Sequence, residues 1–216
     1  GFDLHSVREY ERGESLRKVH WKTTARRGQL MVKELEDAPR DEIAVILDAD
    51  ATAVVGESFD VQVRAAGSIL RAHAAQGRQA VLAVNSATRP TARVASLEGD
   101  WPAALGVLAA AEPDGGRPVA ELLARESGPA SRAFETVVVT ARLSGALATR
   151  LVQRALSGQG VSVVWVDTAS FGGRVAPVEP ELLRLQRAGV AVAVVRRGDS
   201  LASVLGARAS AGRAVG

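Results

Sequence analysis

From Glu42 to the end of the chain, short runs of aliphatic residues alternate with stretches in which apolar positions recur three and four apart. A near-continuous aliphatic run is typical of a strand covered on both faces. Apolar positions three and four apart are typical of a helix with one buried face. The pattern predicts buried strands at 42–48, 79–85, 136–140, 161–167 and 190–195. It predicts helices at 58–76, 101–111, 119–126, 145–156, 180–188 and 200–205.

This alternation, with connections of these lengths, indicates the α/β class: an open, mostly parallel sheet with helices on both faces. Ser58 is the expected N-cap of the first helix, and Gly77 is expected to end it. After the turn Thr88-Arg-Pro-Thr91, a short segment near Val94 is expected to form an edge strand. The longest apolar run, Val190–Val195, is much shorter than the roughly 18 residues that a membrane-spanning helix needs.

The first 37 residues do not follow the alternation. Strands are predicted over residues 4–10 and 30–35, and a short helix that Gly28 closes is predicted over residues 14–25. Pro39 marks the end of this part. The small and polar residues at the end of the chain are typical of a frayed terminus. The chain is therefore divided into an N-terminal β/α appendage over residues 1–38, an α/β domain over 39–207 and a flexible tail over 208–216.

Positive charge is concentrated in the appendage. Residues 8–33 hold eight basic and three acidic side chains, whereas residues 41–216 hold 18 basic and 17 acidic ones. The chain has no cysteine, which excludes a disulfide framework, a thiolate zinc site and a cysteine nucleophile. The three histidines have no metal-ligand spacing, and no Gly-x-Ser-x-Gly or glycine-rich phosphate-loop pattern is present. These absences argue against hydrolase chemistry and nucleotide binding.

Residues 7–34 resemble the signature of a bacterial family called domain of unknown function 58. The matching positions are Arg8, Tyr10, Gly13, Glu14, Arg17, Val19, Trp21, Ala25, Arg26, the apolar segment Leu30–Val32 and Glu34. The one departure is Glu14, where the family usually has Asp. Members of the family carry this motif beside a domain similar to the von Willebrand factor type A domain. That domain has a Rossmann-like α/β fold, in agreement with the class predicted above.

The resemblance also implies a cellular location and partner proteins. The family is described as anchored in the membrane by N-terminal hydrophobic helices that this chain lacks. It is also described as encoded beside MoxR-type AAA+ ATPases and transglutaminase-like membrane proteins, which are therefore the expected partners. The resemblance implies that this chain is the soluble part of a longer protein at the cytoplasmic face of the bacterial inner membrane. No enzymatic activity comes with the family, so we expect a chain that is not an enzyme.

The von Willebrand type A resemblance further implies a place for a metal ion. Such domains hold a divalent cation with Asp-x-Ser-x-Ser after the first strand, a Thr from a later loop and an Asp after the fourth strand. Mg²⁺ requires oxygen ligands of this kind in near-octahedral geometry. The matching positions here are Asp48, Asp50 and Thr52, then Arg117 in Gly115-Gly116-Arg117, and last Thr140 and Arg142. Two oxygen donors are lost, and two arginines have taken their place.

An arginine beside these carboxylates repels a cation. We therefore expect no metal cofactor and a degenerate metal-ion-dependent adhesion site. The Arg117 guanidinium is expected to bridge Asp48 and Asp50, whose side chains point the same way on an extended segment. The alternative is that Asp48, Asp50 and Thr52 hold Mg²⁺.

Three interpretations of Trp21 stay open. The neighbouring basic residues are Arg17, Lys18, Lys22 and Arg26. We favour packing of the Trp21 ring against arginine stems. Stacking on single-stranded nucleic acid is less favoured, because such grooves interleave several aromatic residues and Tyr10 is the one companion nearby. The third interpretation is attraction of the basic segment to an anionic membrane surface. We expect no specific nucleic-acid partner.

Open α/β sheets bind their ligands above the carboxyl ends of the strands. Six polar residues are expected to converge there: Asp48, Asp50, Thr52, Arg117, Thr140 and Arg142. We interpret this face as a protein-docking surface; the alternative is a relic whose charges satisfy one another. The leading hypothesis is a non-enzymatic protein-interaction module. The second is a metal-dependent ligand-binding domain, and the third is binding of nucleic acid or an anionic membrane through the basic segment.

Overall fold

The computed structural model describes residues 6–9, 24–26, 28–29, 31–34, 42–124, 128, 131 and 133–211. The chain forms two compact units, Gly1–Arg40 and Asp41–Gly216. In the first unit, β1 (Ser6–Glu9) and β2 (Met31–Glu34) pair in antiparallel fashion, as two strands in the positions that the sequence predicts. Residues 24–26 are helical, and the rest of the predicted helix, residues 14–23, lies outside the described residues.

Backbone hydrogen bonds define the turn that leads to β2. Gly28 N donates to Thr24 O at 2.9 Å, and Met31 N donates to Thr24 Oγ1 at 3.0 Å. Gly28 has a φ of 69°, in the left-handed region that glycine adopts at helix ends without steric cost. The predicted role of Gly28 at the end of a helix agrees with this conformation.

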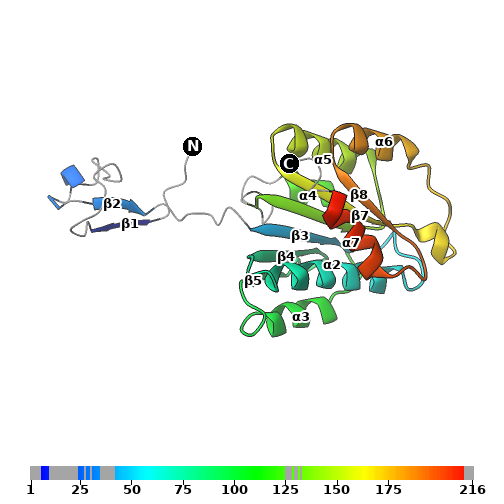
Figure 1. Ribbon diagram of the computed structural model, residues 1–216, viewed down its shortest axis with the longest axis horizontal. Helices are drawn as coiled ribbons and strands as arrows, with labels where there is room; N and C mark the ends of the chain where they lie inside the picture. Colours follow the sequence, from blue (N-terminus) through cyan, green and yellow to red (C-terminus); the bar gives the residue numbers. More distant parts are fainter. Residues whose placement is uncertain are drawn as a thin grey trace. The chain divides into compact units, whose positions relative to one another are not determined.

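The second unit is built on a six-stranded sheet with the order β5-β4-β3-β6-β7-β8 (Figure 1). The strands are β3 (Ile43–Asp48), β4 (Ala80–Asn85), β5 (Thr91–Val94), β6 (Glu135–Thr140), β7 (Gly160–Val166) and β8 (Ala191–Val195). All pairs are parallel except β4 with β5, so the sheet is mixed. The buried strands and the edge strand predicted from the sequence are confirmed.

Helices cover both faces of this sheet, as predicted (Figure 1). One face carries α2 (Ser58–Ala74), α3 (Trp101–Ala109) and α7 (Leu201–Ala211). The other carries α4 (Val119–Ala124), α5 (Gly145–Leu156) and α6 (Glu179–Arg187). Because successive side chains of a strand point to opposite faces, Val45 and Leu47 pack under the first group while Ala44 and Ile46 pack under the second. A strand covered on both faces must be apolar throughout, which explains the aliphatic runs.

Two expectations about helix ends are wrong. Glu57, not Ser58, is the N-cap of α2, and the Ser58 hydroxyl instead accepts a hydrogen bond from Val55 N at 2.9 Å. Ser58 is fully buried, so its hydroxyl stabilises the loop that enters the helix. In addition, α7 continues to Ala211, into the segment 208–216 expected to be a tail. Alanine and arginine, which recur over residues 207–211, have high helix propensity.

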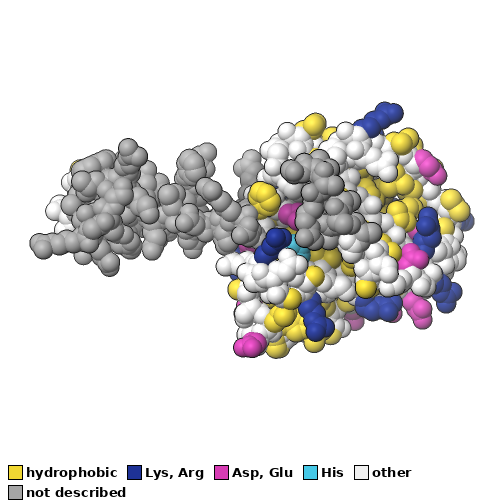
Figure 2. Space-filling view, in the orientation of Figure 1, with side chains coloured by type: hydrophobic (Ala, Val, Ile, Leu, Met, Phe, Trp, Pro, Cys, Tyr) yellow, Lys and Arg dark blue, Asp and Glu magenta, His cyan; other side chains and the backbone are white. Residues whose placement is uncertain are grey.

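Two surface properties of the described residues bear on function. None of their helices has both the length and the apolar character needed to span a bilayer. On the face of the α/β unit seen in Figure 2, basic and acidic side chains are interspersed among apolar and neutral ones. This agrees with the near balance of 18 basic and 17 acidic residues after residue 40.

The strand order singles out one position on the sheet. From β3 the chain proceeds to β4 on one side, and from β6 it proceeds to β7 on the other side. Neighbouring strands β3 and β6 therefore form the topological switch point, where open α/β sheets bind ligands outside the carboxyl ends of the strands. Asp48 ends β3 and Thr140 ends β6.

Candidate functional site

Asp48 lies at the centre of a buried hydrogen-bond network at the switch point. It is flanked by Asn85, its register partner at the end of β4, and by Thr140 at the end of β6. Asn85 Nδ2 donates to Asp48 Oδ1 at 3.1 Å, and Thr140 Oγ1 donates to Asp48 Oδ2 at 2.8 Å. Asp48 is only 4% exposed, so these two donors supply the hydrogen bonds that water gives an exposed carboxylate.

Burial raises the pKa of Asp48 above its ordinary value of 3.8, because the ionised carboxylate loses hydration in the interior. The hydrogen bonds from Asn85 and Thr140 oppose this rise in pKa, since they stabilise the charged form. Repulsion by Asp50 adds to the rise, and attraction by Arg142 opposes it. Asp48 therefore takes up a proton more readily than an exposed aspartate does.

A more exposed ion pair lies beside this network. Arg142 Nε is 3.0 Å from Asp50 Oδ2, and Arg142 Nη2 donates to Thr52 Oγ1 at 2.6 Å. The other oxygen of Asp50 accepts hydrogen bonds from Thr52 N at 2.8 Å and from Thr52 Oγ1 at 2.7 Å. The Arg142 side chain is 50% exposed and that of Asp50 is 21% exposed, so solvent screens the attraction between them.

The turn after β6 positions Arg142. Thr140 Oγ1 accepts a hydrogen bond from Arg142 N at 2.9 Å, and Trp165 Nε1 donates to Ala141 O at 3.3 Å. The Thr140 hydroxyl thus joins the two groups, since it donates to Asp48 and accepts from the backbone of Arg142. Because Thr140 is fully buried within the sheet, the start of this turn is fixed by the fold.

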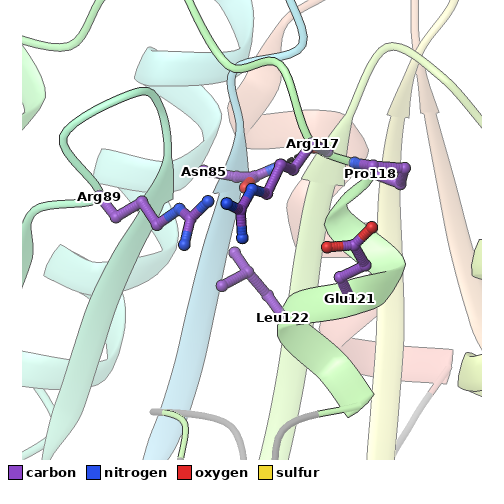
Figure 3. A pocket seen from close by; sticks show the side chains of 6 residues that line it. All are labelled: Asn85, Arg89, Arg117, Pro118, Glu121 and Leu122. Carbon is purple, nitrogen blue, oxygen red and sulfur yellow. Dashed lines mark hydrogen bonds between the residues drawn. The ribbon is translucent and has the colours of Figure 1, made fainter.

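The predicted bridge from Arg117 to Asp48 and Asp50 is wrong. Arg142 pairs with Asp50, and Asp48 is held by the neutral donors Asn85 and Thr140. The two carboxylates differ in their surroundings, one at the end of a buried strand and the other in a partly exposed loop. Arg117 contributes its carbonyl to the network, accepting from Asn85 Nδ2 at 2.8 Å, and its side chain lines a neighbouring pocket (Figure 3).

The loop that contains Gly115 lies against the loop after β3, which brings the Gly115-Gly116-Arg117 segment to the carboxyl edge of the sheet, as expected. Gly115 and Asp50 form an isolated parallel bridge, in which Gly115 N donates to Ala49 O at 2.8 Å and Ala51 N donates to Gly115 O at 3.2 Å. A Cβ atom at position 115 would overlap Asn85 O and lie 2.8 Å from Ala49 O. Glycine is therefore required here by the close approach of neighbouring backbones.

The residues at this site do not fit a divalent cation. Every carboxylate oxygen of Asp48 and Asp50 already has a partner within the chain, and the Arg142 guanidinium lies beside them. Mg²⁺ needs several free oxygen ligands, and a neighbouring guanidinium repels it. Within the described ranges, no group of three His, Cys, Asp or Glu side chains could hold a metal ion. Asp48, Asp50 and Thr52 thus form a network satisfied from within the chain.

The motif of the first unit is described only in part. Arg8 lies in β1, and the exposed side chains of Ala25 and Arg26 belong to the helical residues 24–26. The motif residues outside the described part of the chain are Tyr10, Gly13, Glu14, Arg17, Val19, Trp21 and Leu30. The interpretations of Trp21 stay predictions.

Sequence reasoning missed Asn85 and Arg89. Asn85 is the last residue of a predicted buried strand. A polar residue at the carboxyl end of the strand beside Asp48 is the signal from which its place in the site could have been predicted. Its amide donates to both Asp48 and Arg117, so it connects the network with the loop after α3. Arg89 follows β4 in a short turn and has a φ of 51°. No local sequence pattern predicts this conformation.

Together these features define an α/β protein whose open mixed sheet carries, at its switch point, a buried aspartate and an adjoining Asp–Arg ion pair. The chain belongs to the family described as "Protein of unknown function DUF58", whose model matches residues 6–168. The resemblance stated for residues 7–34 is therefore confirmed at the level of the family. The matched region also includes both carboxylates of the network and extends through β7.

Two known proteins are similar to parts of this chain. The uncharacterized protein YeaD of Bacillus subtilis (strain 168) is 30% identical over 140 residues, which are 64% of this chain and 34% of that protein. The chain thus spans about a third of the length of this relative. Proximal thread matrix protein 1 (PTMP1) from the mussel byssus matches with a TM-score of 0.53 and 13% identity, over 79% of this chain and 47% of that one. At this identity the likeness concerns the fold alone.

Proposed function

We propose that this chain is a non-enzymatic protein-interaction module, and that the carboxyl edge of its sheet is the docking face. The observation that carries the proposal is the pairing of Arg142 with Asp50 and Thr52. The pairing neutralises the partly exposed carboxylate of Asp50 from within the chain. The face then offers a fixed polar surface, which a protein partner can complement with hydrogen bonds.

The same network supports a role without catalysis. The Thr140 hydroxyl is buried and shared between Asp48 and the backbone of Arg142. The Thr52 hydroxyl donates to Asp50 and accepts from Arg142. A nucleophilic hydroxyl needs a base that is free to take its proton and open access to the substrate. Neither threonine meets both conditions.

The family resemblance supplies the finer part of the proposal. The α/β unit is von Willebrand factor type A-like with a degenerate adhesion site, and the full-length protein is anchored at the cytoplasmic face of the bacterial inner membrane. Its partner is a MoxR-type AAA+ ATPase, with a transglutaminase-like membrane protein as a second partner. The Asp48-x-Asp50-x-Thr52 segment at the end of β3 supports this assignment of the fold.

The test measures binding of the purified chain to a MoxR-type ATPase from the same organism. It compares two variants that each carry one new arginine, one at the carboxyl edge of the sheet and one at the end of α2. Ala51 is exposed on the docking face, and Ala75 is exposed at the end of α2, away from the Asp48 network. Because a large charged side chain blocks close docking, Ala51→Arg is expected to weaken binding about tenfold or more, whereas Ala75→Arg leaves it unchanged. Equal binding by both variants would show that this face does not dock the ATPase.

The metal-dependent alternative gives a different result in the same samples. If Asp48, Asp50 and Thr52 held Mg²⁺, the cation would raise the Tm of the chain and a chelator would lower it. We expect the Tm of the chain alone to be the same in excess Mg²⁺ and in chelator. A clear rise of Tm with Mg²⁺ overturns the proposal in favour of a metal-dependent ligand-binding domain. Steeply salt-dependent binding of an oligonucleotide would favour the third hypothesis.

A further inference from the structure

We propose that Arg89 and Arg117 form a binding site for a carboxylate side chain on an acidic segment of a protein partner. This inference rests on the proposed function, because it names the chemistry that the docking face recognises. Arg89 comes from the turn between β4 and β5, and Arg117 comes from the segment between α3 and α4. Figure 3 shows their guanidinium groups converging above Leu122, where both side chains line a small pocket that is open to solvent.

Hydrogen bonds fix the backbone beneath both arginines. Asn85 Nδ2 donates to Arg117 O at 2.8 Å, and Arg89 N donates to Ser86 Oγ at 3.3 Å. Ala87 N donates to Asp114 Oδ1 at 2.9 Å, which ties the β4–β5 turn to the segment before Arg117. The two guanidiniums are therefore carried by loops that are already joined. A preorganised pair of this kind binds a ligand at a smaller entropic cost.

Within the part of the chain that the structure describes, neither guanidinium makes an ion pair or a hydrogen bond. Two cations that converge on one pocket repel each other, and an anion between them replaces that repulsion with charge-assisted hydrogen bonds. Arg89 is also the one non-glycine residue with a positive φ among the described residues. Backbone strain of this type is enriched at functional sites.

The charge of the pocket favours a carboxylate over a phosphate group. Two guanidiniums and the carboxylate of Glu121 line it, giving a formal charge of +1. A bound carboxylate brings this formal charge to zero, whereas a phosphate monoester, which carries about −2 at neutral pH, leaves a net negative charge beside the Glu121 carboxylate. Leu122 and Pro118 offer apolar surface to the methylene groups of an Asp or Glu side chain. Asn85 lines the pocket and also contacts Asp48, which places the pocket at the margin of the docking face.

The test is an NMR titration of the full chain with a capped tetraglutamate peptide, with acetate and with inorganic phosphate, all at one ionic strength. We expect saturable shifts of the Arg89 and Arg117 Nε–Hε signals with the peptide and with acetate. Arg89→Gln and Arg117→Gln are each expected to weaken peptide binding about tenfold. Arg78→Gln is the matched control, because Arg78 is exposed near the opposite end of β4 and should leave the affinity unchanged.

Glu121→Gln tests the argument from charge. This variant raises the formal charge of the pocket to +2, so it is expected to strengthen phosphate binding more than acetate binding. A wild-type chain that prefers phosphate to acetate would overturn the assignment to carboxylates. Absence of saturable peptide binding would overturn the site, as would an equal loss of affinity in Arg78→Gln and Arg89→Gln, which indicates general charge attraction.

The outcomes separate this inference from the proposed function. If Ala51→Arg blocks the ATPase but the wild-type chain does not bind the peptide, the docking face is supported and the carboxylate site is refuted. If the peptide binds through Arg89 and Arg117 but the ATPase does not bind, the carboxylate site is supported and the ATPase is excluded as the partner.

Discussion

Replacement of Gly115 by alanine tests whether the loop before Arg117 depends on close contact with its neighbours. The new Cβ would overlap Asn85 O and lie 2.8 Å from Ala49 O, and both are backbone atoms in or next to central strands. The loop must therefore move away. Its movement breaks the two hydrogen bonds of the Gly115–Asp50 bridge, from Gly115 N to Ala49 O and from Ala51 N to Gly115 O.

The magnitude follows from these contacts. Each lost backbone hydrogen bond costs about 1 kcal/mol, and forcing an extra methyl group into a packed site costs about 1–3 kcal/mol more. The free energy of unfolding should fall by about 3–5 kcal/mol, a large fraction of the roughly 5–15 kcal/mol typical of a folded domain. In a domain of this size that corresponds to a Tm lower by about 10 °C.

The matched control is Gly116→Ala, because a Cβ at that position meets nothing within 4 Å. Both substitutions restrict the unfolded chain equally, so the difference between them isolates the steric effect. Urea unfolding followed by circular dichroism gives both free energies. If Gly115→Ala and Gly116→Ala agree to within about 0.5 kcal/mol, the close approach of these backbones is refuted.

Two further predictions concern Asp48 and the start of α5. The pKa of Asp48 is raised by burial, so the stability contributed by this group is present below its unfolded value of 3.8 and is lost as the pH rises through the higher folded value. In Asp48→Asn the amide oxygen can accept from Asn85 and the amide nitrogen can donate to Thr140 Oγ1, and the side chain does not titrate. The stability of this variant relative to wild type should therefore increase, in urea unfolding, as the pH rises above the unfolded value of Asp48; a decrease would contradict the assigned shift. Ser144 caps α5, because its hydroxyl accepts a hydrogen bond from Leu147 N at 3.2 Å. Ser144→Ala should therefore lower the free energy of unfolding by about 1 kcal/mol. Ser157→Ala, at the exposed C-terminal end of the helix, is the control and should lower it little. Equal losses in the two serine variants would refute the capping role.

The fold was predictable from the sequence because the central strands are covered on both faces. Such strands must be aliphatic along their whole length, and Ile43–Asp48 and Ala80–Asn85 show this pattern plainly. The position of the site was predictable for a related reason. Polar residues that follow buried strands collect at the carboxyl edge, which brings Asp48 and Thr140 together.

The partners within the site were not predictable in the same way. Arg117 and Arg142 both follow elements that end at this edge. From the sequence alone, either arginine could pair with Asp50. The choice depends on the turn after β6, where Thr140 and Trp165 hold the backbone that carries Arg142. It also depends on Asn85, which fixes the carbonyl of Arg117 while the side chain of Arg117 lines the pocket. These are contacts between loops distant in sequence, and no local pattern encodes them.

The pairing of Arg142 with Asp50 has a consequence for regulation. A site completed by a metal ion can be switched off by chelation or by a fall in the supply of that ion. A guanidinium is attached to the chain and keeps its charge throughout the physiological pH range. The positive charge at this edge is therefore present as soon as the chain folds and does not vary with the divalent cations of the cell. Under the proposed docking function, divalent cations would then not control binding through this pair, and control would come from the abundance of the partner or from the ionic strength.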